Sequence, residues 1–155
     1  MKPLIEKFLG VAARITPCAQ SAVLLFLRIM IGWTFFLTGK GKLANFDRTT
    51  HFFESLKIPA PAFHAGFVGG LEMVGGILLL IGLCSRLISV PLLFSMIVAY
   101  LTADREAFAS ISDFTAAAPF IYLCVTLVIL VFGPGKFSLD ALIARRFAST
   151  FSAGR

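Results

Sequence analysis

Long apolar runs separated by short polar segments dominate the hydropathy pattern of the chain. A helix needs about 20 residues to cross the hydrocarbon core of a bilayer, because each residue rises only about 1.5 Å. Four runs approach or exceed that length, at residues 22–43, 62–83, 87–103 and 114–132. The pattern therefore predicts an all-α integral membrane protein, in which residues 1–155 form a single four-helix transmembrane bundle.

Two further segments, both ahead of the second span, have the composition of short interfacial helices. Residues 2–16 place apolar side chains at helical spacing, and we expect this helix to end before Pro17. The long connection over residues 44–61 is too apolar for a free loop. It predicts a short helix around Thr50 to Leu56, ended by the prolines that follow. This helix is expected either to anchor the chain at the interface or to cover a lipid-soluble ligand as a lid.

The remaining connections are short and restrict how the spans pack. Three residues join the second and third spans, so these two helices are expected to form an antiparallel hairpin. Gly133, Pro134 and Gly135 stop the fourth span. Ser138 is then the expected N-cap of a last short helix over residues 139–147, and residues 148–155 are expected to form a disordered tail.

Composition agrees with a membrane protein, and the basic residues indicate its orientation. Of the 155 residues, 58% are hydrophobic and 14% are charged, against about 25% charged in soluble domains. Lys and Arg concentrate on the side that holds both termini, which the positive-inside rule assigns to the cytoplasm. They are Lys2, Lys7, Arg14, Arg86, Lys136, Arg145, Arg146 and Arg155, against Lys40, Lys42, Arg48, Lys57 and Arg105 on the other side. Topology and lipid headgroups explain this charge, so no nucleic acid partner is expected.

Two opposite charges interrupt the predicted spans: Arg28 in the first and Glu72 in the second. A charge in hydrocarbon costs about 2.5–3.5 kcal/mol on insertion scales, so each marks a candidate functional site. Both lie on glycine-bearing faces, where membrane helices approach closely, and both are expected to point into the bundle. The glycines expected at helix contacts are Gly32, Gly39, Gly66, Gly69, Gly70 and Gly76. Direct contact of the two charges stays open, because each side chain leans toward the N-terminus of its own helix, and the two therefore lean apart.

Further polar and aromatic side chains are expected near this pair. They are Trp33, Tyr100, Tyr122 and Thr126. Such a cluster would hydrogen-bond the carbonyl of a quinone between aromatic walls. The same cluster would equally well have a structural role, in which an ion pair and hydrogen bonds fix the register of the helices. The sequence leaves both interpretations open. Lys40 and Lys42, at the outer end of the first span, are interpreted as snorkelling anchors or as a positive rim for an anionic ligand.

Metal and thiol chemistry are not expected. His51, Glu54 and His64 are three candidate ligands without a second carboxylate, which is a weak pattern for a metal site. The three cysteines form no C-x-x-C pair and are expected to be free, inert thiols: Cys18, Cys84 and Cys124. No tightly bound cofactor is expected, because the chain offers no haem, flavin or iron–sulfur ligand set. A quinone is the candidate ligand.

Three groups of residues follow one another at matching membrane boundaries. They are Arg28, Gly32, Gly39, Lys42 and Leu43, then Leu71, Glu72, Gly75, Gly76, Leu80, Gly82 and Arg86, then Gly133, Pro134, Gly135, Ser138, Leu139 and Asp140. This string resembles the DoxX family over nearly the whole chain. The resemblance implies a four-helix protein of the prokaryotic cytoplasmic membrane with both ends inside. It also implies kinship with the small membrane subunit of thiosulfate:quinone oxidoreductase and with proteins linked to oxidative stress or quinone detoxification.

The favoured hypothesis is a quinone-linked redox or oxidative-stress membrane subunit that acts with a partner protein. In this hypothesis Glu72 donates or accepts a proton and Arg28 polarises a quinone carbonyl. The ligand would be lined by Arg28, Trp33, Glu72, Tyr100, Tyr122 and Thr126. The alternative is a non-enzymatic scaffold that anchors a multiprotein complex. Membrane lipids and either a protein partner or a second copy of the chain are the expected partners, and the sequence leaves open whether the protein is an enzyme.

Overall fold

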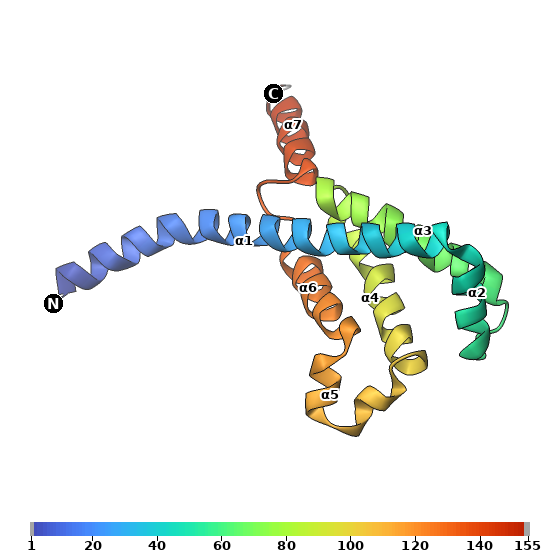
Figure 1. Ribbon diagram of the computed structural model, residues 1–155. Coiled ribbons are helices and arrows are strands. Elements are labelled where there is room, and N and C mark those ends of the chain that lie inside the picture. Colours follow the sequence, from blue (N-terminus) through green and yellow to red (C-terminus); the bar gives the residue numbers. More distant parts are fainter. Residues whose placement is uncertain (1, 154–155) are drawn as a thin grey trace.

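The computed structural model describes the backbone of residues 2–153 and the side chains of residues 16–146 (Figure 1). Residues 2–153 are helical apart from short turns and contain no strand, so the predicted all-α membrane fold is confirmed. In chain order the elements are α1 (Lys2–Ala44), α2 (Phe46–Ser55), α3 (Pro61–Ile81), α4 (Ser85–Thr102), the 3₁₀ helix η1 (Arg105–Ala109), α5 (Ile111–Ala116), α6 (Ala118–Phe132) and α7 (Leu139–Ala153).

Three of the described helices are long and apolar enough to cross a membrane. The crossing segments are Thr16–Ala44 within α1, Pro61–Ile81 (α3) and Ser85–Thr102 (α4). Helix α6 is also apolar but has 15 residues, which gives about 22 Å of helix against a hydrocarbon core of about 30 Å. The chain is therefore a multi-pass membrane protein.

A proline divides the fourth apolar run, which we predicted as one helix over residues 114–132. Pro119 has no N–H to donate to the carbonyl of Thr115, and its ring would clash with that carbonyl in a continuous helix. The backbone instead breaks, so that α5 ends at Ala116 and α6 begins at Ala118. Pro119 thereby lies in the first turn of α6, where no N–H is needed.

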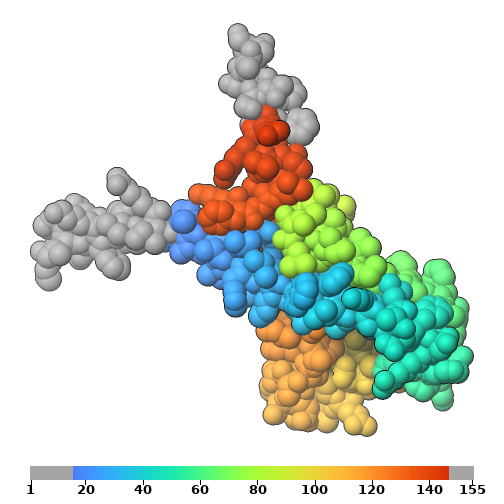
Figure 2. Space-filling model, turned by 45° about the horizontal axis from the view of Figure 1, so that its top comes forward, coloured from blue at the N-terminus to red at the C-terminus, as the bar shows by residue number. Residues whose placement is uncertain are grey.

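The described helices pack mainly as two pairs, α1 against α3 and α4 against α6 (Figures 1 and 2). Contacts between the two pairs are fewer, and the pairs diverge in Figure 1, so that α2 lies at the far end of one pair and η1 and α5 lie at the far end of the other. We call these two far ends together the loop end. At the opposite end α3 stops, α4 starts, α6 stops and α7 leaves the bundle, and we call this the tail end.

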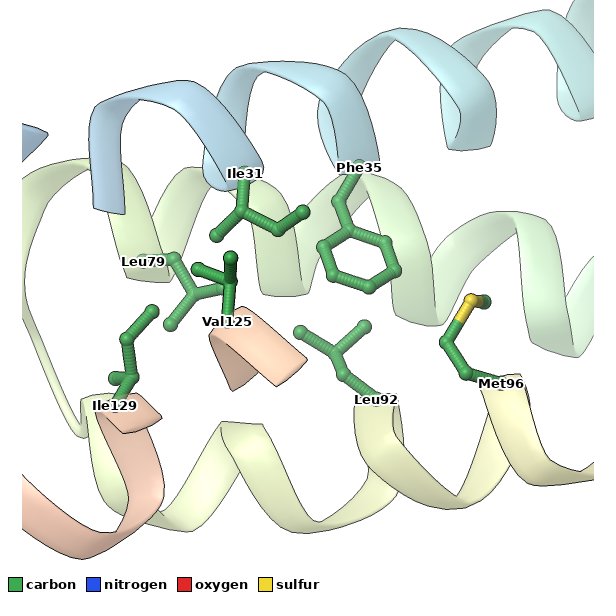
Figure 3. Close-up of a cluster of buried hydrophobic side chains, with 7 residues drawn as sticks. All are labelled: Ile31, Phe35, Leu79, Leu92, Met96, Val125 and Ile129. Carbon is green, nitrogen blue, oxygen red and sulfur yellow. The ribbon is translucent and has the colours of Figure 1, made fainter. Parts of the chain in front are cut away.

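A cluster of buried side chains from all four of these helices lies between the two pairs (Figure 3). Its members are Ile31, Phe35, Leu79, Leu92, Met96, Val125 and Ile129. The Phe35 ring is fully buried and meets the ring of Tyr122 edge-on, with centroids 4.8 Å apart. Because lipid is as apolar as these side chains, close van der Waals packing stabilises this cluster more than removal from the surrounding solvent does.

Glycines bring the backbones of α1 and α3 into direct contact. Four of the six expected glycines lie at this contact: Gly32, Gly39, Gly69 and Gly76. A Cβ added at Gly76 would lie 2.5 Å from the Phe36 nitrogen and 2.6 Å from the Gly32 carbonyl oxygen. Gly70 differs, because a Cβ there would meet no atom within 4 Å. Gly66 makes only an ordinary contact with α2.

The three short helices expected from the sequence differ from the structure in their bounds. No helix ends before Pro17, because α1 continues through that proline as one helix of 43 residues. Prolines are tolerated in membrane helices, and the carbonyl that loses its N–H partner here is that of Ala13, one turn before Pro17. The carbonyl of Pro17 itself accepts a hydrogen bond from the Ser21 hydroxyl at 2.7 Å. The helix expected around Thr50 to Leu56 begins earlier, at Phe46, and ends at Ser55.

The last helix is longer than expected. Helix α7 extends past the expected end at residue 147 to Ala153, and the Ser138 hydroxyl accepts a bond from the Ala141 N–H, as an N-cap does. Side chains from residue 147 onward and the backbone of residues 154–155 lie outside the described residues. Disorder of the tail over residues 148–155 therefore stays a prediction.

The close approach of α1 and α3 predicts opposite outcomes for two glycines of α3. Gly76→Ala should destabilise the protein by about 1–3 kcal/mol, because the backbones must separate to admit the methyl group. Gly70→Ala is the matched control and should leave stability unchanged or raise it slightly, since alanine favours helix by about 1 kcal/mol. Thermal unfolding in detergent measures both. Equal unfolding midpoints for the two variants would contradict the close backbone contact between α1 and α3.

Candidate functional site

The two charges within the spans lie in two separate polar centres. Arg28 and Glu72 are each 1% exposed, yet no ion pair joins them among the described residues. Arg28 bonds to the carbonyl of Leu79 at the tail end, seven residues along α3 from Glu72 and therefore about 10 Å away along the helix. In the antiparallel pair of α1 and α3, the lean of each side chain toward its own N-terminus carries the two charges apart.

The guanidinium of Arg28 binds backbone carbonyls of two other segments. Its Nε donates to the Leu79 carbonyl at 3.0 Å, and its Nη2 reaches the Leu80 carbonyl at 3.4 Å. Its Nη1 donates to the carbonyls of Pro134 and Phe137, at 2.5 and 3.2 Å, in the loop that follows α6. The last carbonyls of a helix have no partner within the helix, so Arg28 supplies donors where α3 ends.

Gly82 makes room for this arrangement. The residue follows α3 with a φ of +71°, a left-handed conformation that glycine adopts without strain. A Cβ at this position would lie 2.6 Å from the Nη2 atom of Arg28 and 2.7 Å from Ser138. Gly82 is therefore required both by its backbone conformation and by the buried guanidinium beside it.

Asp140 completes the tail end by capping a helix distant in sequence. Its carboxylate accepts bonds from the N–H groups of Cys84 and Ser85, at 2.8 and 3.1 Å, where α4 begins. Its own N–H donates to the Gly82 carbonyl at 3.0 Å, and its charge lies near enough to Arg28 to interact with it. A carboxylate at a helix N-terminus is favoured by the helix dipole. We call Arg28, Gly82, Asp140 and the loop over residues 133–138 the tail-end junction.

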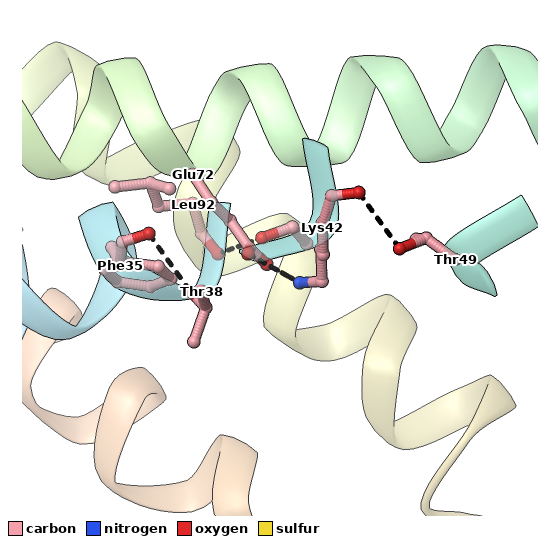
Figure 4. Close-up of polar contacts among 7 residues, drawn as sticks. Phe35, Thr38, Lys42, Thr49, Glu72 and Leu92 are labelled. Atoms are coloured by element: carbon pink, nitrogen blue, oxygen red, sulfur yellow. Dashed lines mark hydrogen bonds and ion pairs between the residues drawn. The ribbon is translucent and has the colours of Figure 1, made fainter. Parts of the chain in front are cut away.

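The second centre is an ion pair between Lys42 and Glu72 (Figure 4). The Nζ atom of Lys42 lies 2.5 Å from both carboxylate oxygens of Glu72. The Glu72 side chain is 2% exposed and that of Lys42 30% exposed, so the pair lies at the edge of the buried interior. The interpretation of Lys42 as a snorkelling anchor is wrong, because its side chain turns inward to the carboxylate.

A sequence signal for Lys42 was present. Arg28, Gly32, Phe35, Gly39 and Lys42 follow one another at spacings of four and three residues, which puts them on one face of α1. Since this face contacts α3, its last residue also faces α3. The lean of a lysine toward the N-terminus of α1 then carries its ammonium group toward Glu72.

Of the other expected site residues, Tyr122 is the one whose phenol the Glu72 charge reaches, although no hydrogen bond joins the two among the described residues. The Tyr122 ring contacts Phe35. Thr126, one turn away on α6, is fully buried, and its hydroxyl has no hydrogen-bond partner among the residues that the structure describes. We call Lys42, Glu72 and Tyr122 the carboxylate centre.

Two expected site residues lie elsewhere. Trp33 is 53% exposed and packs against Phe36 on the surface of α1, with ring centroids 5.7 Å apart. Tyr100 is buried toward the loop end, where its hydroxyl donates to the Phe114 carbonyl at 2.7 Å and its ring stacks on that of Phe114. Arg28, Trp33 and Tyr100 therefore do not form one site with Glu72.

The two centres differ in the chemistry they offer. At the tail-end junction the guanidinium of Arg28 already donates hydrogen bonds to four backbone carbonyls. This geometry favours a structural role, in which Arg28 joins the helix ends, over the binding of a ligand carbonyl. The carboxylate centre contains a carboxylate and an ammonium in direct contact, with a phenol within reach of the carboxylate charge. Side chains of these types serve elsewhere as general acids and bases.

The histidines and cysteines add no further site within the described residues. His51 pairs with Glu54 at 3.1 Å, and the Nδ1 atom of His64 lies 3.2 Å from the Ala60 carbonyl oxygen. Residues 16–146 contain no group of three or more His, Cys, Asp or Glu side chains that would hold a metal ion. The three cysteines are free and exposed.

The tail-end junction predicts that arginine is specifically required at position 28. Arg28→Lys keeps the charge but leaves several of the four carbonyls without a donor, so we expect a loss of about 3 kcal/mol of unfolding free energy. Trypsin should also cleave the variant faster at Lys136, in the loop that Arg28 holds. Arg105→Lys, at an exposed arginine with one bond to backbone, is the control and should change neither property. Unchanged cleavage at Lys136 in Arg28→Lys would contradict the assigned role.

Comparison with known proteins supports one family. The sequence profile of the DoxX family matches residues 23–105. An uncharacterized membrane protein of Mycobacterium tuberculosis, Rv3486, is 32% identical over 131 residues, which cover 77% of this chain and 80% of the relative. The Bacillus subtilis protein named "Putative oxidoreductase CatD" is 32% identical over 99 residues, covering 64% of this chain and 69% of the relative.

An uncharacterized protein of Haemophilus influenzae is 27% identical over 128 residues, which cover 79% of this chain and 83% of that protein. No solved structure gives a significant match. The profile match covers more than half of the chain and includes both intramembrane charges, Arg28 and Glu72, together with Lys42. The chain therefore belongs to the DoxX family of membrane proteins.

Proposed function

We propose that this protein is a membrane subunit of a quinone-linked redox system, with the carboxylate centre as its quinone site. The observation that carries the proposal is the buried Glu72 carboxylate beside Lys42 and the Tyr122 phenol. A relative named as an oxidoreductase supports the reaction class. A buried ion pair is weak evidence for stability, so its place inside a small membrane bundle favours a functional role.

The chemistry of the centre fits a quinone headgroup. Reduction of a quinone to a quinol takes up two electrons and two protons, and its carbonyl oxygens become hydroxyl groups. In our proposal the Tyr122 hydroxyl donates a hydrogen bond to one carbonyl, and Glu72 passes protons to or from the oxygen atoms. Lys42 holds the carboxylate in place, and the Phe35 ring beside Tyr122 forms one wall.

Electrons must come from a partner protein. The chain has three cysteines far apart in sequence and offers no haem, flavin or iron–sulfur ligand set. We therefore propose that a soluble or membrane-bound redox protein docks with this subunit. Arg28 has no direct part in the reaction, because its donors serve the tail-end junction.

Access from the lipid phase is consistent with a lipid-soluble ligand. Lys42 keeps 30% of its side-chain surface exposed, so the centre is close to the surface of the bundle. Large apolar side chains on α2 and α3 are exposed toward the same end, among them Phe46, Phe63 and Phe67. A quinone dissolved in the bilayer would therefore approach the centre across an apolar surface.

The proposal includes an orientation. We infer that α5 and α6 together complete a fourth crossing over residues 111–132, since both are helical and α6 alone is short. With four crossings, both termini lie on one side, and the excess of Lys and Arg at the tail end assigns that side to the cytoplasm of a prokaryotic cell. The carboxylate centre then lies in the outer half of the cytoplasmic membrane.

Quinone content of the purified protein tests the proposal. The wild-type protein, extracted in mild detergent, should retain quinone that mass spectrometry detects, and Glu72→Gln should retain about tenfold less, because a charged hydrogen-bonding partner is lost. Glu106→Gln, at an exposed glutamate of η1, is the matched control and should retain the wild-type amount.

Two outcomes would overturn this function. One is wild-type protein with no more quinone than an unrelated membrane protein purified in parallel. The other is equal quinone in Glu72→Gln and the wild type. A protein partner recovered together with a quinone-free bundle would instead favour the scaffold.

A further inference from the structure

A groove opens at the tail end between α1, the loop after α6 and α7. Its volume is about 620 Å³. The orange-red surface of this loop and α7 adjoins the blue surface of α1 in Figure 2. The groove is separate from the carboxylate centre, and none of the residues proposed to bind quinone line it.

The lining of the groove combines cationic and polar side chains with apolar ones. Lys136 and Arg145 contribute two positive charges, and Gln20 adds an amide. Leu24 lies on the crossing segment of α1, and Phe132, which is 58% exposed, ends the apolar helix α6. A ligand with a charged head and an apolar body fits this combination.

Asp140 also lines the groove, but its negative charge is already engaged. Its carboxylate accepts the N–H groups of Cys84 and Ser85 at the start of α4 and lies near the Arg28 guanidinium. The tail-end junction therefore offsets this acid, and Lys136 and Arg145 leave the groove with a positive balance.

The position of the groove in the fold indicates which kind of ligand it binds. It lies where the crossing segment of α1 begins and the apolar helix α6 ends, which corresponds to the boundary between hydrocarbon and water. Helix α7 exposes Leu139, Leu142 and Ile143 at spacings of three and one residues, with Arg145 further along the helix. This pattern is typical of a helix that lies in the headgroup layer of a membrane.

We propose that this groove binds the phosphate headgroup of an anionic phospholipid. Lys136 and Arg145 pair with the phosphate, Gln20 donates to a headgroup oxygen, and the acyl chains follow Leu24 and Phe132 along the bundle. The bound lipid joins α7 to the crossing helices. This site is independent of the proposed quinone chemistry.

The experiment compares two double variants of equal charge loss. Full-length protein in neutral detergent is titrated with phosphatidylglycerol, and the thermal unfolding midpoint gives the apparent dissociation constant. Lys136→Gln with Arg145→Gln should weaken binding roughly 25-fold, at about fivefold for each surface charge removed. Lys40→Gln with Arg48→Gln, two exposed basic residues near the loop end, should keep the wild-type constant.

Parallel titrations identify the source of the phosphate. Phosphatidylcholine should raise the midpoint of the wild-type protein much less than phosphatidylglycerol does, and millimolar inorganic phosphate should not raise it. If the first double variant fails to fold, Arg145→Gln alone should show the fivefold loss, because this exposed side chain makes no hydrogen bond or ion pair with the side chains and backbone described for residues 16–146.

Three results would overturn the proposal. Equal losses in both double variants would indicate general surface charge, and an unchanged constant in the first would exclude the groove. A response to inorganic phosphate as large as that to phosphatidylglycerol would indicate a site for free anions. Quinone content should be unchanged in Lys136→Gln with Arg145→Gln, so failure here is distinguishable from failure of the proposed function.

Discussion

The buried guanidinium of Arg28 is the interaction on which the rest of the bundle depends. A charge in this position is stabilised only if its donors are occupied, and here the partners are the carbonyls at the end of α3 and in the loop after α6. One side chain of α1 therefore fixes where α3 stops and where the chain turns toward α7. Gly82 provides the necessary space, and Asp140 adds the cap that starts α4.

Closure of the tail end has a consequence for the other centre. Because the helices are joined by hydrogen bonds at one end and by glycine contacts along α1 and α3, the opposite end does not need its polar groups for structure alone. The Lys42–Glu72 pair lies toward that end, where the two helix pairs diverge (Figure 1). Under the proposed function, this separation leaves the carboxylate, the ammonium and the phenol available for proton exchange without destabilising the fold.

Sequence reasoning recovered three of the four predicted spans and the glycine face between α1 and α3, since these follow from hydropathy and from spacings of three and four residues. It could not distinguish Pro17, which lies within a continuous helix, from Pro119, which divides two. Each proline removes one backbone N–H. Whether the helix continues then depends on which neighbouring groups donate to the carbonyl that loses its partner.

The residue pattern gives no signal for the partners of Arg28 and only an indirect signal for the partner of Glu72. Arg28 binds backbone carbonyls, which every residue carries and which therefore leave no trace in a sequence. Glu72 binds a lysine that could be recognised only by treating Lys42 as part of the same helix face as Arg28. Trp33 and Tyr100 were expected near Glu72, but a similar position along the span does not determine the side of the helix on which a residue lies.

The central claim is that the two intramembrane charges serve separate centres, and a pair of double-mutant cycles tests it most directly. Unfolding free energies in detergent would be measured for Arg28→Met, Lys42→Met and Glu72→Gln, and for each of the first two combined with the third. We expect Lys42 and Glu72 to be coupled by at least about 1 kcal/mol, and Arg28 and Glu72 to be additive within about 0.5 kcal/mol. Coupling between Arg28 and Glu72, with additivity between Lys42 and Glu72, would contradict the two-centre arrangement.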